Sequence, residues 1–226
     1  MYSGIIKTFR KIIFTFFTLT IIVNAQGTII PLMQDGWVGG LSGSLGWDNY
    51  TIKAGDESSG VDSKAKGFDF ILSSRNGRFV EDNIVLGFDL QWEENNLTTT
   101  SQNNSDNETY TKKKLGFIGL WTRYYIPFIG TGWAIYPEVS AGYGSFKSIN
   151  EETSVSKNNA SANGFVYNVG FGATMFVSNN VAFEATGRYQ GGKLNGNYEF
   201  TSESYDDLEI KLSNIDVLFG IMIYLR

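Results

Sequence analysis

The chain consists largely of runs in which large apolar side chains alternate one by one with small or polar ones. The segment 84–93 reads IVLGFDLQWE, with a large apolar residue at every even-numbered position. Successive side chains of a β-strand point to opposite faces, so this period of two predicts strands with one apolar face. No segment after residue 26 shows a sustained helical period. Similar runs lie at 37–48, 165–175, 181–190 and 216–225, and two less regular ones near 67–75 and 114–126.

The connections between these runs alternate in length. Polar segments rich in Ser, Thr, Asn, Asp and Glu lie at about 54–66, 94–113, 147–163 and 191–211. Short turns lie near 76–83, 127–132 and 177–180, which are spaced by roughly fifty residues. Counted from residue 26, this spacing predicts about four hairpins, and hence about eight antiparallel strands in up-and-down order.

The first 25 residues have the composition of an export signal. Three cations, Lys7, Arg10 and Lys11, precede the apolar run Ile12–Val23, and the small residue Ala25 ends the segment. The run is shorter than the roughly 20 residues that a membrane-spanning helix needs, so we predict a cleaved signal peptide at 1–25 and a barrel domain at 26–226. Cleavage changes the formal net charge from −5 to −8, because it removes three cations and no acid. So acidic a chain is a poor partner for nucleic acid.

Two closed eight-stranded architectures have this alternation: a soluble barrel with an apolar interior and a membrane barrel with an apolar exterior. Long connections alternate with short ones, the strand runs reach about ten residues, and aromatic residues lie near the strand ends, all of which favour the membrane barrel. We therefore predict an all-β fold, an eight-stranded antiparallel up-and-down transmembrane β-barrel with short periplasmic turns and long extracellular loops. The strand-end aromatic residues are Trp47, Tyr50, Trp92, Tyr124, Trp133, Phe165, Tyr167 and Tyr189.

Three segments, FILSSRNGRFVEDNIVLGFDLQW, RYYIPFIGTGWAIYPEVSAGYG and GATMFVSNNVAFEATGRY, resemble the small porin-like outer-membrane β-barrel family of Bacteroidetes-type bacteria. That family shares its fold with the OmpA and OmpX barrels. The resemblance implies a location in the outer membrane of a Gram-negative bacterium, contact with its lipid, and insertion by the outer-membrane assembly machinery. It also implies a C-terminal assembly signal at Gly220, Ile223 and Leu225, although Leu225 stands where Phe is usual in the family and Arg226 follows it.

The chain contains no His and no Cys. This composition excludes Ser–His and Asp–His catalysis, thiolate nucleophiles, and metal sites built on imidazole or thiolate ligands. It also excludes a lipid anchor on a cysteine. We therefore predict no catalytic, cofactor-binding or metal-binding residues, and expect that the protein is not an enzyme.

The clustered ionisable groups lie at inward positions of the predicted strands. A barrel of this size is too narrow for a water channel, and two interpretations of these charged groups are open. They line a pathway for protons or cations, or they form a lattice of ion pairs and hydrogen bonds that fills the lumen. We favour the lattice. Arg123 is placed inward because an arginine that faces lipid is costly. The predicted lumen network consists of Asp48, Asp69, Arg75, Asp89, Glu93, Arg123, Glu138, Glu184, Arg188 and Asp216.

The leading functional hypothesis is a monomeric, non-enzymatic integral outer-membrane barrel with a plugged polar lumen. It has a structural role, or binds an extracellular or envelope protein through four polar external loops. Two alternatives stay open at this stage: a narrow porin-like channel for small solutes or ions, and a soluble lipocalin-like binder in the periplasm.

Overall fold

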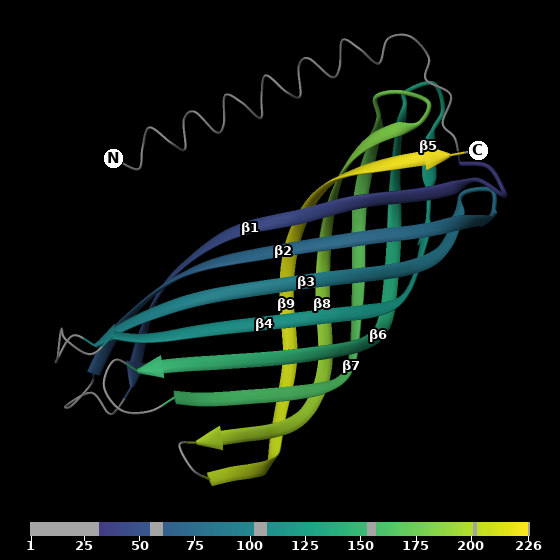
Figure 1. Ribbon diagram of the computed structural model, residues 1–226. Helices are drawn as coiled ribbons and strands as arrows, with labels where there is room; N and C mark the ends of the chain where they lie inside the picture. The colour runs from purple at the N-terminus through teal and green to yellow at the C-terminus, as the bar shows by residue number, and fades with distance from the viewer. Residues whose placement is uncertain (1–31, 55–60, 102–107, 153–156, 201–202, 226) are drawn as a thin grey trace, which may run out of the picture.

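The computed structural model describes residues 32–54, 61–101, 108–152, 157–200 and 203–225. The predicted signal peptide, residues 1–25, lies outside the described residues, so its cleavage stays a prediction. Within the described ranges, no helix is long and apolar enough to cross a membrane. The strands are β1 (Trp37–Ala54), β2 (Val61–Glu81), β3 (Ile84–Ser101), β4 (Glu108–Tyr124), β5 (Ile126–Phe128), β6 (Trp133–Glu152), β7 (Lys157–Phe176), β8 (Val181–Phe200) and β9 (Glu203–Leu225) (Figure 1).

The strands form one antiparallel sheet that closes on itself. Consecutive strands pair from β1 to β4 and from β6 to β9, and the ring closes through the β1–β9 and β4–β6 pairs. β4 and β5 both pair with β6 and only Tyr125 separates them, so together they form one interrupted strand. The predicted antiparallel up-and-down barrel with eight positions in its wall is therefore confirmed.

The register of the ladders shows how the sheet closes. A line of paired residues that starts at Gly43 and crosses every ladder reaches Glu209 on β9. The direct β1–β9 ladder instead pairs Gly43 with Phe219, which lies ten positions further along β9, from 209 to 219. Such a stagger is what a closed sheet requires, and it tilts the strands by about 35–45° from the barrel axis.

The outer face of the barrel is apolar. Along β3, Phe88 and Leu90 are exposed, whereas Asp89 between them is buried, and on β9 the exposed Phe219 follows the buried Leu218. A closed sheet with apolar side chains outside and charged ones inside is the arrangement of a barrel that crosses a membrane, and it does not fit the soluble lipocalin-like alternative. The predicted strand-end aromatic residues exposed on this face are Trp92, Tyr124, Phe165, Tyr167 and Tyr189; the side chains of Trp47 and Tyr50 are not described, and Trp133 is half-buried.

The two ends of the barrel differ. The short turns lie where the sequence predicts them, between β2 and β3, β5 and β6, and β7 and β8, and Asn83 in the first of them has a φ of 69°, which Asn tolerates. We call this the turn end. At the opposite, hairpin end, the polar segments expected as loops are strands over much of their length: β3 continues to Ser101 and β4 begins at Glu108, with their residues paired. Backbone pairing in water requires no apolar face, so the ladders continue beyond the point at which the alternation ends.

Candidate functional site

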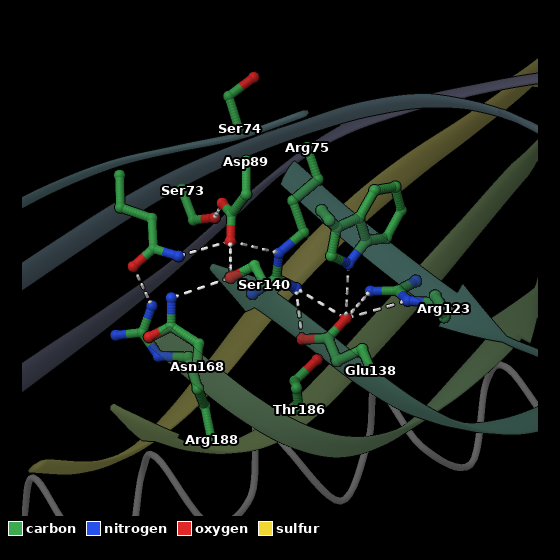
Figure 2. A network of polar contacts seen from close by, with 12 residues as sticks. Ser73, Ser74, Arg75, Asp89, Arg123, Glu138, Ser140, Asn168, Thr186 and Arg188 are labelled. Atoms are coloured by element: carbon green, nitrogen blue, oxygen red, sulfur yellow. Dashed lines mark hydrogen bonds and ion pairs between the residues drawn. The ribbon is translucent and has the colours of Figure 1, made fainter. Parts of the chain in front are cut away.

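Glu138 of β6 lies in the barrel interior and accepts hydrogen bonds from side chains on the neighbouring strand (Figure 2). Its Oε2 accepts Arg123 Nη2 at 2.7 Å, Arg123 Nε at 3.0 Å and Trp121 Nε1 at 3.3 Å. Its Oε1 lies 3.0 Å from Arg75 Nη1. All four side chains are buried, so this carboxylate is withdrawn from water and neutralised by two guanidinium groups.

Arg123 of β4 connects this carboxylate to a second one, that of Glu184 on β8. Its Nη1 lies 2.5 Å from Glu184 Oε1 and donates to the Tyr125 hydroxyl at 2.8 Å. Its guanidinium carbon lies 3.7 Å from the ring centre of Tyr136, whose hydroxyl donates to Glu184 Oε2 at 3.3 Å. A guanidinium held between two carboxylates and over an aromatic face has both its charge and its donors satisfied within the protein.

A second group of contacts surrounds Asp89 of β3. The hydroxyls of Ser73 and Ser140 each donate to its carboxylate at 3.0 Å, and Gln91 Nε2 donates to it at 2.5 Å. Asn168 Nδ2 donates to Ser140 Oγ at 2.9 Å and extends the group toward β7, as Figure 2 shows. Polar side chains from several strands therefore converge on one buried carboxylate.

The two remaining arginines join these groups. Arg75 Nε lies 3.7 Å from Asp89 Oδ2, and Nη1 of the same side chain contacts Glu138. Arg188 of β8 donates to Gln91 Oε1 at 2.5 Å and pairs with Asp216 Oδ2 at 2.8 Å. One polar cluster thus crosses the lumen, and it consists of Arg75, Asp89, Gln91, Arg123, Glu138, Glu184, Arg188 and Asp216.

The three other predicted residues, Asp48, Asp69 and Glu93, lie nearer the hairpin end of their strands. Asp69 and Glu93 are half-buried and lie closer to the hairpin end, and Asp48 is on β1 in a stretch whose side chains are not described. The residues of the expected assembly signal, Gly220, Ile223 and Leu225, lie in the last strand, where Ile223 and Leu225 are exposed on the apolar face. Their role in assembly stays a prediction.

An aromatic cluster fills the lumen at the turn end, and the sequence prediction did not include it. The hydroxyls of Tyr125 and Tyr224 lie 2.9 Å apart, the rings of Phe176 and Tyr224 have centres 5.0 Å apart, and Phe79 and Tyr136 pack against Tyr125. Each of these five side chains is at most 1% exposed. A signal for it does exist: Phe79, Tyr125, Phe176 and Tyr224 are large residues at inward positions close to the turn end of their strands.

A second apolar group lies inside the barrel toward the hairpin end. Here the inward side chains pack together although the interior of a membrane barrel is ordinarily polar. This inner apolar cluster consists of Leu115, Phe117, Ala162, Val166 and Leu194, with Phe146, Ile210 and Leu212 packed against it. The polar cluster is therefore bounded by apolar side chains on both sides along the barrel axis, whereas the sequence predicted a lumen lined by polar groups.

Contacts with other side chains hold the charged groups of the polar cluster in place. Across the described residues, no group of three or more acidic side chains could hold a metal ion. The carboxylates of the polar cluster are engaged by guanidinium, hydroxyl, indole and amide donors, which is the arrangement of a structural network.

Solved structures that resemble this fold include three outer-membrane proteins. Neisserial surface protein A is 13% identical, with a TM-score of 0.40 over 83% of this chain and 96% of that one. The outer membrane protein OprG from Pseudomonas aeruginosa is 10% identical, with a TM-score of 0.45 over 88% of this chain and 100% of that one. A major outer membrane protein from Thermus thermophilus is 10% identical, with a TM-score of 0.47 over 84% of this chain and 99% of that one. No protein-family model matches the sequence, and no curated protein matches it.

Proposed function

We propose that this chain is a non-enzymatic integral outer-membrane barrel whose lumen is closed by its own side chains. The observation that carries the proposal is the position of the polar cluster directly beside the aromatic cluster, across a narrow lumen. Arg123, Tyr125 and Tyr136 belong to this filling and are among the largest fully buried side chains. Eight strands enclose space for side chains or for one small ligand, and water-filled passages belong to barrels of about sixteen strands.

The apolar exterior supports a location in a bilayer, and the difference between the two ends supports an orientation. Barrels of the bacterial outer membrane have short turns on the periplasmic side and longer connections outside the cell. In that orientation the turn end faces the periplasm, and the hairpin extensions beyond the membrane present polar surface to an extracellular or envelope partner. The last strand, with Gly220, Ile223 and Leu225, is the segment that we expect the assembly machinery to recognise.

Electrical recording from planar bilayers tests the closed lumen. Purified wild-type protein should insert without stable ion conductance, because no continuous water path crosses the polar and aromatic clusters. Reproducible cation-selective channels that change with Glu138→Ala or Glu184→Ala would contradict the proposal and support the narrow channel instead.

A pair of adjacent tyrosines supplies a matched control for this recording. Tyr125 is fully buried in the aromatic cluster, whereas Tyr124 beside it is exposed on the outer face. Tyr125→Ala should give brief conducting events if the aromatic cluster forms the seal, and Tyr124→Ala should be as silent as the wild type. Silence of the folded Tyr125→Ala protein would place the seal in the polar cluster alone.

A further inference from the structure

The outer face repeats one pattern of paired residues on two different pairs of neighbouring strands, at the edge of the apolar band nearest the hairpin end. Between β4 and β6, the successive outward partners are Lys114–Lys147, Gly116–Ser145 and Ile118–Tyr143. Between β8 and β9, they are Lys193–Lys211, Gly191–Ser213 and Tyr189–Ile215. In both ladders two lysines are followed, toward the turn end, by a glycine and a serine and then by an isoleucine and a tyrosine. We call them the β4–β6 and the β8–β9 lysine ladders.

The burial pattern places these residues outside the barrel. Leu115 and Phe117, which alternate with the ladder residues of β4, are buried in the inner apolar cluster. Ile118 and Tyr143 are each 55% exposed, and Lys147 is exposed beyond Tyr143 on the same face of β6. The lysines therefore lie where the apolar band ends, which is the level at which a membrane barrel meets lipid headgroups.

The lysine pairs concentrate positive charge at this level. Lys114 and Lys147 are directly opposite each other, and like charges in that position repel. Of the outward side chains that are described on β3, β4 and β6, Glu94 is the one acid. Its Oε1 lies 2.6 Å from Lys112 Nζ and its Oε2 lies 4.0 Å from Lys114 Nζ. Three lysines around one acid leave two positive charges that an anionic ligand would neutralise.

The wall is low beside the β4–β6 lysines. A side chain added at Gly116 would first meet the carbonyl oxygen of Ser145, 4.0 Å from its Cβ. Further toward the turn end, Leu120 and Ala141 are the next outward partners after Ile118 and Tyr143, and they line an apolar outer groove of about 300 Å³. Lys114 and Leu120 are about 20 Å apart along the strand, a span that an extended acyl chain covers.

We propose that the β4–β6 lysine ladder binds a membrane lipid with a phosphomonoester headgroup. The phosphate lies between Lys114 and Lys147, the adjoining part of the lipid passes over Gly116, and an acyl chain follows the outer face to the groove. A phosphomonoester carries nearly two negative charges at neutral pH and accepts charge-assisted hydrogen bonds from lysine, so it matches this pair better than a diester does. The proposal goes beyond the closed-lumen barrel and does not depend on it.

The β8–β9 lysine ladder has the same charges but less room. The ring of Tyr167 on β7 lies over Gly191, at the place where Gly116 is open in the other ladder. We therefore expect this ladder to bind the same lipid more weakly.

Native mass spectrometry of the purified protein in detergent, titrated with defined lipids, tests the site. Phosphatidic acid is the phosphomonoester probe, and we expect one molecule to bind tightly and a second more weakly. Phosphatidylglycerol, a diester with one charge, should bind several-fold more weakly, and phosphatidylcholine more weakly still. Equal binding of phosphatidic acid and phosphatidylcholine would overturn the site, and equal binding of the two anionic lipids would overturn the choice of a phosphomonoester. Displacement by an equal concentration of inorganic phosphate would overturn a lipid as the occupant.

Two neighbouring lysines supply the matched variants. Lys114 faces outward, whereas Lys113 shares the inward face of β4 with Leu115. Lys114→Gln should weaken the tighter binding of phosphatidic acid several-fold, and Lys113→Gln, with the same change of charge, should leave it unchanged; equal effects would contradict the proposal.

Gly116→Leu tests the seating of the lipid without a change of charge. It raises the low part of the wall and should also weaken the tighter binding several-fold, whereas full affinity would overturn the path over Gly116. Each variant is first checked for heat-dependent migration in electrophoresis. The lipid preferences of the wild type test the proposal even if one variant fails to fold.

Discussion

The Arg123 guanidinium illustrates how single residues of the interior depend on one another. It contacts Glu138, Glu184 and Tyr125, and its side chain has no exposed surface. The pairing of two buried charges is only weakly stabilising in itself, but an isolated buried charge is strongly destabilising. Removal of one partner therefore lowers the stability of the fold by more than the small net contribution of the ion pair.

Glu138→Ala should destabilise the folded barrel by about 3–5 kcal/mol, because it leaves the guanidinium groups of Arg75 and Arg123 without this carboxylate in a buried site. The measurement is equilibrium unfolding by urea in detergent micelles or bilayers. Glu81→Ala, at an exposed position beside a short turn, is the control and should change stability by no more than about 0.5 kcal/mol. Equal effects of the two substitutions would show that the polar cluster is not a stabilising network.

Phe219→Asp should strongly reduce insertion, because Phe219 is 65% exposed on the apolar outer face and a carboxylate there would meet lipid. The expected penalty is on the order of 2 kcal/mol, less than that of a cation at the same depth. Phe219→Leu keeps an apolar side chain and should insert like the wild type. The folded fraction recovered from isolated membranes is the readout, and a normal yield of Phe219→Asp would refute the outward orientation of this residue.

Among the elements, β1 and β9 form the junction between the first and the last described strands, and their ladder is much shorter than those beside it. Short pairing at a closing junction makes this the part of the wall most easily separated. Because the chain contains no Cys, introduced cysteine pairs can report on the junction without interference.

The pair Leu41→Cys/Ile221→Cys should form a disulfide on mild oxidation, because Leu41 and Ile221 are register partners on the outer face and partners in antiparallel strands have Cα atoms about 4.5–5.5 Å apart. The residues of the control pair, Leu45→Cys/Val217→Cys, would be register partners if the ladder continued. They lie beyond its last pair, so this pair should stay reduced. The extent of cross-linking is read from thiol labelling of the denatured protein. Rapid cross-linking of the second pair would show that the wall is closed there.

The sequence predicted the elements well where the two faces of a strand differ, as in β3 and β9, because alternation marks both the strand and the side that faces inward. It failed in the hairpin extensions, where both faces are polar and no alternation distinguishes a paired strand from a loop. The lumen was predicted from charge, so Arg123 and Glu138 were singled out, whereas Tyr125 and Leu212 were not. Which apolar inward residues meet across the lumen depends on the ten-residue stagger, and a single sequence does not show that stagger.

For the whole molecule, closure of the sheet is the property that determines stability. At the turn end every strand except the short β5, which pairs with β6 alone, is paired on both sides, so none of these strands can detach without breaking two ladders.

Unboiled and boiled samples should therefore migrate differently in detergent electrophoresis. The compact barrel resists the detergent until it is heated, whereas an ordinary soluble domain unfolds in both samples. Identical migration of the two samples, for protein recovered from membranes, would contradict the closed barrel.

The polar cluster also determines the order in which the chain can assemble. Arg123 and Glu138 are register partners on neighbouring strands, so they meet as soon as β4 pairs with β6. Glu138 meets Arg75, however, across 63 residues of sequence, and Arg188 meets Gln91 across 97. Contacts between such distant residues form late and slowly. A half-inserted chain would expose these charges to lipid, so the N-terminal strands are not stable in a bilayer before the C-terminal ones arrive, and insertion becomes a single cooperative event whose slow step is closure of the ring.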